Sequence, residues 1–224
     1  MATDLATKAR VIAAASALFA EHGFHGTTVR DIAQRAKVNL AAGHYHFGSK
    51  ETLYLEVLRT LFGDIMATLE QRGARLDMHR RRPSAAALRQ MLHMRIAAML
   101  ELLLGPPPGL PGTLMMREMC DPSAALPDIV EQFIRPHKRE MEAVVAGLMP
   151  RLARAEVERC VLSIFGQVFF YRHQLPALRL LFGERPLTRP WMQATAEHIF
   201  QFSLGGMASV AGRARRRSAA RAAR

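Results

Sequence analysis

The chain has 224 residues, half of them hydrophobic, and a formal net charge of +12. This composition is typical of a globular protein with a sizeable core and excludes an intrinsically disordered chain. Two cysteines exclude a disulfide scaffold or a cysteine-rich metal motif, and no apolar run approaches the roughly 18 residues of a membrane span. Helix-forming Ala, Leu, Met and Arg are abundant while alternating β-branched runs are absent, so the composition predicts an all-helical fold.

The first helix is predicted from an apolar segment near the N-terminus. Lys8 and Arg10 precede residues 11–20 (VIAAASALFA), an order that resembles a signal peptide. The apolar side chains recur at helical spacing, however, and Gly23 follows as a left-handed helix cap. We therefore interpret the segment as an amphipathic helix and expect the protein to be cytoplasmic, without a membrane partner.

Two short helices are predicted next, separated by a turn. Thr28 and Asp31 have the spacing of a capping box, which predicts a helix over Val29–Ala36 with its turn at residues 37–38. Asn39 is a good N-cap for a second helix over residues 40–45. Ser49 then caps a third, long helix from residue 50 to about residue 77. Two short helices at a turn, supported by a third, are the helix-turn-helix design, whose second helix enters the major groove of DNA.

The rest of the chain is predicted to be a larger helical domain. Residues 105–112 (GPPPGLPG) predict a rigid loop, and residues 176–189 have no clear pattern. Six arginines and no acid lie in residues 210–224, which predicts a basic, disordered tail. The expected domains are residues 1–50, 51–210 and 211–224. Further helices are expected over residues 84–104, 113–120, 128–149, 151–174 and 190–205.

Residues 27–58 (TTVRDIAQRAKVNLAAGHYHFGSKETLYLEVL) strongly resemble the head of the TetR family of bacterial repressors, and within it the CecR-like subgroup. The looser match continues through Arg117-Glu118, Phe165-Gly166-Gln167 and His198-Ile199, so that the resemblance covers about residues 10–210. It implies a dimer that binds a double-stranded DNA operator through an N-terminal helix-turn-helix. A C-terminal helical bundle would dimerise and enclose an inducer, whose identity the sequence does not indicate.

The resemblance and side-chain chemistry together assign DNA contacts. Hydroxyls, a ring nitrogen and cations beside helix N-termini suit phosphates, whereas short side chains and amides suit base edges. His44 stands where the subgroup commonly has Asn, so its operator sequence does not carry over. Alternatives remain open, because Thr28 can be only a cap, Lys50 a solvated helix start and Tyr45 a packing residue. The expected phosphate contacts are Thr27, Thr28, Arg30, Tyr45, His46 and Lys50, and the expected base contacts are Asn39, Ala41, Ala42 and His44.

Candidate ligand and dimer residues are chosen as polar or methionine positions on apolar helices. Methionine at helical spacing is also typical of an ordinary core, and Arg117–Glu118 can instead be a structural ion pair. The ligand candidates are Met66, His93, Met94, Arg117, Glu118, Gln167 and Tyr171. The dimer candidates, on the last two long helices, are Val161, Phe165, Phe169, Ile199 and Phe202.

A ligand-responsive repressor is the function that the sequence favours. In this hypothesis the long helix from residue 50 links the ligand domain to the DNA-binding head. The alternative is an architectural DNA binder that depends on the basic tail. We expect no enzyme, cofactor or metal site, because the sequence holds no P-loop, G-x-S-x-G, HExxH or cysteine–histidine metal spacing.

Overall fold

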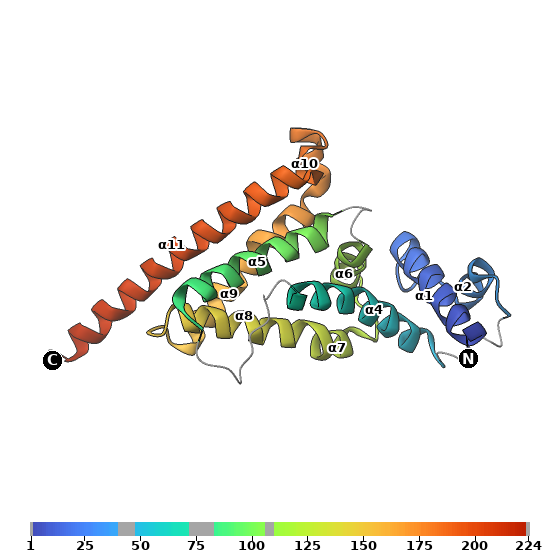
Figure 1. The fold of residues 1–224 in the computed structure, drawn as a ribbon, viewed down its shortest axis with the longest axis horizontal. Helices are drawn as coiled ribbons and strands as arrows, with labels where there is room; N and C mark the ends of the chain where they lie inside the picture. Colours follow the sequence, from blue (N-terminus) through green and yellow to red (C-terminus); the bar gives the residue numbers. More distant parts are fainter. Residues whose placement is uncertain (1, 40–47, 72–82, 106–109, 223–224) are drawn as a thin grey trace. The chain divides into compact units, whose positions relative to one another are not determined.

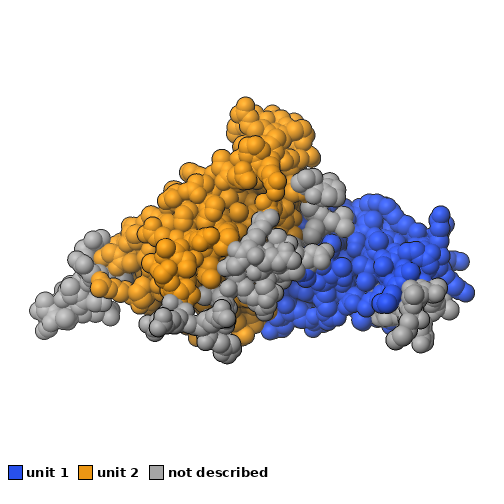
Figure 2. All heavy atoms as spheres, in the orientation of Figure 1, with its two compact units in different colours: residues 1–66, 107–134 blue, residues 67–106, 135–224 orange. Residues whose placement is uncertain are grey.

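The computed structural model describes residues 2–39, 48–71, 83–105 and 110–222, and every regular element there is helical, as predicted (Figure 1). The chain divides into two compact units, coloured separately in Figure 2. Unit 1 comprises residues 1–66 and 107–134, and unit 2 comprises residues 67–106 and 135–224. This division differs from the expected boundary at residue 50 in two respects. Unit 1 extends to residue 66, and it also includes residues 107–134.

Unit 1 is built around an aromatic cluster. Phe19, Phe24 and Tyr54 are all buried, and the Tyr54 ring lies 4.8 Å from Phe19 and 5.2 Å from Phe24 between centroids. The Phe19–Tyr54 pair is edge-to-face, a geometry that adds to the stabilisation from burial. The helices are α1 (Ala2–His22), α2 (Val29–Ala36), the first part of α4 (Lys50–Gln71), α6 (Leu110–Cys120), α7 (Leu126–Ile129) and the π-helix η1 (Val130–Ile134).

Unit 2 is a bundle with its own apolar core. Gly147 marks a close approach of two helices, since a Cβ there would lie 2.8 Å from Leu88 Cδ1. The core side chains come mainly from α5, α8, α9 and α11. These helices are α5 (Ala85–Leu104), α8 (Arg135–Leu148), α9 (Arg154–His173) and α11 (Arg189–Ala222), joined by α10 (Leu175–Phe182) and the 3₁₀ turn η2 (Arg185–Leu187).

Several element boundaries differ from the sequence-based prediction. Helix α6 begins at Leu110, inside the expected loop. Pro111 lies in its first turn, where backbone N–H groups have no partner within the helix, so the missing N–H of proline costs no hydrogen bond. Helix α11 continues to Ala222 through the expected disordered tail, because Ala and Arg are strong helix formers and no Pro follows residue 190. The expected end of the long helix, residues 72–77, lies outside the described residues. None of the helices that the structure describes has the length and apolar character needed to cross a membrane.

Candidate nucleic-acid interface

The turn between α1 and α2 depends on one glycine. Gly23 has φ +75°, and its N–H donates to Phe19 O at 2.9 Å. This left-handed conformation suits glycine, because in any L-residue the Cβ would lie too close to the following carbonyl oxygen. The predicted left-handed cap of the first helix is therefore confirmed.

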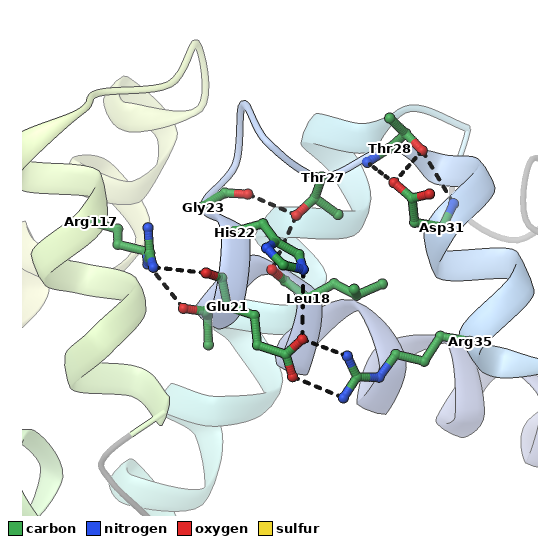
Figure 3. A network of polar contacts seen from close by, with 10 residues as sticks. Leu18, Glu21, His22, Gly23, Thr27, Thr28, Asp31, Arg35 and Arg117 are labelled. Atoms are coloured by element: carbon green, nitrogen blue, oxygen red, sulfur yellow. Dashed lines mark hydrogen bonds and ion pairs between the residues drawn. The ribbon is translucent and has the colours of Figure 1, made fainter.

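Thr27 supports this turn from inside. The residue is 1% exposed, and its hydroxyl lies 2.8 Å from Gly23 O and 3.1 Å from Leu18 O, both acceptors (Figure 3). A buried hydroxyl that already donates to main-chain carbonyls does not offer itself to a phosphate. The expectation that the Thr27 side chain contacts DNA is corrected: it holds α1 to the loop that precedes α2.

Lys50 binds the same turn from the start of α4. Its Nζ donates to Phe24 O at 2.9 Å and to Thr27 O at 3.1 Å, and it lies 4.2 Å from the centroid of the Phe24 ring. These contacts satisfy two carbonyls and add a cation–π attraction. Lys50 thus has a structural role that the sequence pattern did not indicate, while its predicted contact with phosphate stays a prediction.

Helix α2 begins with the predicted capping box. Thr28 Oγ1 accepts from the Asp31 N–H at 3.2 Å, and the Thr28 N–H donates to Asp31 Oδ2 at 3.1 Å. The Thr28 hydroxyl also donates to the same carboxylate, at 2.6 Å. These hydrogen bonds lower the pKa of Asp31 below its ordinary value because they favour the charged carboxylate. Thr28 is therefore a cap, and its exposed position leaves the predicted phosphate contact open.

Helix α2 ends in a Schellman motif at the helix-turn-helix turn. The Val38 N–H donates to Ala33 O at 3.0 Å, and the Lys37 N–H donates to Gln34 O at 3.1 Å. Lys37 has φ +54°, the left-handed conformation usually taken by glycine at this position. Val38 is half-buried and packs on the core of unit 1. The second helix, predicted over residues 40–45, follows this cap in the sequence and lies outside the described residues.

Two arginines secure the C-terminal end of α1 (Figure 3). Arg35 of α2 makes a bidentate pair with Glu21, with N···O distances of 2.7 and 2.9 Å, and the pair lowers the pKa of Glu21. Arg117 of α6 donates to Ala20 O and Glu21 O, both at 2.9 Å. A cation at a helix C-terminus satisfies free carbonyls and opposes the negative end of the helix dipole. Arg117 was predicted to bind ligand, and this placement instead makes it a cap of α1.

Glu118 also has its partners inside unit 1. Its side chain is 2% exposed, and Oε1 accepts from the N–H and the hydroxyl of Ser123, each at 2.9 Å. Burial and the neighbouring Glu118 carboxylate raise the pKa of the Tyr54 hydroxyl. Glu118 was predicted to contact a ligand, but its hydrogen bonds to Ser123 instead order the loop after α6.

The predicted DNA contacts divide into four groups. Thr27 is buried, whereas Thr28, Arg30 and Asn39 are exposed on unit 1. Lys50 is half-buried in the turn described above. The remaining predictions, Ala41, Ala42, His44, Tyr45 and His46, lie outside the described residues.

The ligand candidates of unit 2 do not share one site. His93 Nε2 lies 3.1 Å from Glu197 Oε2, Gln167 Nε2 donates to Ser203 Oγ at 3.3 Å, and the Tyr171 ring packs edge-on against Trp191. These partners on α11 span residues 191–203, or about 18 Å of helix at 1.5 Å per residue. The three side chains therefore lie at different levels along α11, and their common role in binding a ligand stays a prediction. Met94 is half-buried on α5, and the side chain of Met66 is not among those that the structure describes.

The dimer candidates separate into core and surface. Val161 and Ile199 are 0% and 1% exposed and belong to the core of unit 2, which corrects their prediction as interface residues. Phe165 is half-buried against that core. Phe169 and Phe202 are exposed, and Phe202 lines a groove of about 550 Å³ between α9 and α11.

Helices α1, α2 and α4 pack around one core, as the supporting helices of a helix-turn-helix head do, and the predicted second helix of that motif lies outside the described residues. Residues 11–57 match the bacterial regulatory proteins of the tetR family, and residues 88–207 match the C-terminal domain of the HTH-type transcriptional dual regulator CecR. The chain belongs to the TetR family of transcriptional regulators, in its CecR-like branch. This confirms the predicted family and places the chain among regulators and not among enzymes.

Similar proteins support this assignment. The chain is 33% identical to CecR of Shigella flexneri over 143 residues, which cover 62% of this chain and 63% of that protein. It is 26% identical to the regulator RutR of Escherichia coli K12 over 218 residues, covering 90% and 91%. A transcriptional regulator from Aquifex aeolicus VF5 has the same fold, with a TM-score of 0.60 at 19% identity, over 88% of this chain and 98% of that one.

Proposed function

We propose that this chain is a ligand-responsive repressor that binds a pseudo-palindromic operator as a dimer and is released by a small-molecule inducer. The observation that carries the proposal is the doubly capped α2. Its capping box and Schellman turn fix the chain immediately before residues 40–45, the predicted recognition helix. Members of the TetR family bind operator DNA as dimers, so two such heads would read half-sites about one DNA turn apart.

Exposed aromatic side chains on unit 2 support the dimer. Phe170 is 53% exposed and Phe202 is 65% exposed, and Leu162 adds a further exposed apolar side chain on α9. Helices α9 and α11 pack against each other, and exposed apolar side chains on adjoining helices are typical of a surface that another molecule covers. We assign this surface, on α9 and α11, to the second copy of the chain.

The test compares two exposed arginines, one in each unit. Genomic fragments are selected by the full chain at physiological salt and sequenced, and the affinity for the enriched site is then measured against salt concentration. Arg30→Ala should weaken binding and reduce the slope of log affinity against log salt by about 2, because each protomer of the dimer loses one phosphate contact. Arg89→Ala on α5 removes the same charge and should change neither quantity. Equal effects of both variants would contradict a specific head.

Truncation after residue 212 tests the architectural alternative. The removed segment holds six arginines and no acid, so a tail-driven binder should lose most of its affinity for every sequence. The repressor hypothesis expects the same enriched palindrome from the truncated chain, with a uniformly lower affinity at most. Loss of sequence preference on truncation would favour the architectural function.

A further inference from the structure

The interior of unit 2 contains a charged side chain that its surroundings satisfy only in part. Arg95 lies on the core-facing side of α5, is 1% exposed and heads the largest fully buried side chains of the described residues. Its Nη2 donates to Glu140 Oε2 on α8 at 2.5 Å. Nε and Nη1 are also buried, and neither has a hydrogen-bond partner among the described residues.

This arrangement is unusual for a structural ion pair. A buried pair contributes to stability only when further hydrogen bonds satisfy its remaining protons, because the desolvation of the charge is otherwise uncompensated. Arg95 retains two unsatisfied nitrogens, and its partner Glu140 is 31% exposed and in contact with water. The guanidinium therefore has unused hydrogen-bonding capacity inside an apolar core.

A second polar group faces the same place. His137 lies one turn before Glu140 on α8, and its Nε2 is 3.3 Å from Met99 Sδ, one turn after Arg95 on α5. Its ring stacks on Phe165, with centroids 5.6 Å apart and planes 13° apart. Nδ1 is buried and has no partner in the described part of the chain. Burial and the Arg95 charge lower the pKa of His137 to about 4, so the imidazole is neutral at pH 7.

We propose that Arg95 and His137 form the polar end of a ligand site in unit 2, and that this site takes an organic carboxylate with an apolar body. A guanidinium donates to carboxylate oxygens through several N–H groups, and such charge-assisted bonds are strong away from water. Leu92 and Ile96, on the same helix as Arg95, belong to the apolar core of unit 2, and Phe165 stacks on the His137 ring. Binding at this site needs no DNA, but its role in induction rests on the proposed function.

The test is thermal denaturation of the full chain with three carboxylates: acetate, benzoate and octanoate. Octanamide and octylamine are the controls, since they keep the apolar body and change the charge. A carboxylate that binds the folded state should raise the Tm by several degrees at saturation. We expect benzoate or octanoate to do so, and the two controls and acetate to have little effect. An absence of stabilisation by all three carboxylates, or equal stabilisation by octanamide, overturns the proposal.

Three variants locate the site. Arg95→Met should weaken carboxylate binding at least tenfold while leaving the Tm of the unliganded chain unchanged or higher, because a partly satisfied buried charge is replaced by an apolar side chain. His137→Phe retains the stacking on Phe165 and should weaken binding severalfold. Glu140→Gln removes the competing carboxylate and should tighten it. A large fall in the unliganded Tm of Arg95→Met, or unchanged affinity in it, shows a structural arginine and overturns the site.

Operator release is measured separately on the same samples. If carboxylates stabilise the chain through Arg95 but leave DNA affinity unchanged, the site stands and the proposed induction fails. If the chain selects a palindrome but no carboxylate stabilises it, the repressor stands and this site fails. The two proposals are thus tested by independent outcomes.

Discussion

Lys37 combines an unfavourable backbone conformation with an exposed charge at the turn of the DNA-binding head. It is the one residue other than glycine with a positive φ in the described ranges, at +54°. Left-handed backbone disfavours a residue with a Cβ by about 1–2 kcal/mol. The extra flexibility of glycine in the unfolded chain offsets part of this difference. Lys37→Gly should therefore stabilise the protein by about 0.5–1 kcal/mol, measured by urea denaturation.

Lys37→Ala is the matched control, because it removes the charge and keeps the Cβ. It should give no comparable gain, and an equal gain would mean that charge, not backbone conformation, limits stability at this turn. In the proposed function an exposed cation here also lies close to the predicted recognition helix. Lys37→Gly should then lower operator affinity while raising stability, the exchange expected where function tolerates local strain.

The capping box of α2 makes a prediction about pH. The lowered pKa of Asp31 means that its contribution to stability is complete above the pKa of the unfolded chain and is lost as pH falls through the lower folded value. Thr28→Ala should cost about 1 kcal/mol, typical of an N-cap, and raise the pKa of Asp31 toward its ordinary value of 3.8. Carboxyl titration by NMR checks the pKa, and Thr28→Ser should preserve both quantities. An unchanged Asp31 pKa in Thr28→Ala would contradict the capping box.

Residues whose roles are local could be predicted from the sequence, whereas those with distant partners could not. The spacing of Thr28 and Asp31 contains the whole capping motif, so the pattern identified it. Thr27, Lys50 and Arg117 are different, because each makes at least one hydrogen bond to a residue 9 to 97 positions away. A hydroxyl or cation beside a helix start looks the same in sequence whether it binds phosphate or a buried carbonyl.

The prediction of helices from sequence is limited in the same way: bounds set by local caps are predicted, whereas packing partners are not. The bounds of α2 and the start of α4 agree with the prediction, because Thr28 and Ser49 act as local caps. The membership of α6 in unit 1 depends on tertiary packing against α1, which no local pattern contains. The sequence did not identify Glu140 and His137 as neighbours of Arg95 for the same reason, since they lie on another helix. An arginine among the apolar side chains of α5 does, however, indicate a buried polar site in the sequence alone.

The contact between α6 and α1 predicts how the end of α1 opens. Arg117 satisfies two carbonyls at that end, so Arg117→Gln should destabilise the last turn of α1 by about 1 kcal/mol. The measurement is hydrogen exchange of the amides of residues 19–23, which should accelerate about fivefold in the variant. Arg117→Lys retains the charge but cannot donate to both carbonyls with the guanidinium geometry. Its exchange rates should lie between those of the unsubstituted chain and those of Arg117→Gln. Uniform acceleration over the whole of unit 1 would point instead to a general loss of packing.

At the scale of the whole molecule, the exposed apolar surface of unit 2 gives a prediction about assembly. Phe202 is 65% exposed on α11, and covering an apolar side chain of this size with a partner removes its surface from water, which favours association. Phe202→Glu should leave the helical content and the monomer fold intact, because the side chain is outside the core. It should convert the dimer to monomers, measured by light scattering after size-exclusion chromatography.

Leu180→Glu is the matched control for assembly. Leu180 is 90% exposed on α10, a helix that is not part of the α9 and α11 surface that we assign to the second copy. It introduces the same charge on an exposed apolar position and should leave the dimer intact. Monomers of Phe202→Glu should also lose operator affinity more steeply than Arg30→Ala, since one head reads only a half-site. If Phe202→Glu remains dimeric and Leu180→Glu does not, the interface lies on α10, and the apolar residues of α10 take the role assigned here to α9 and α11.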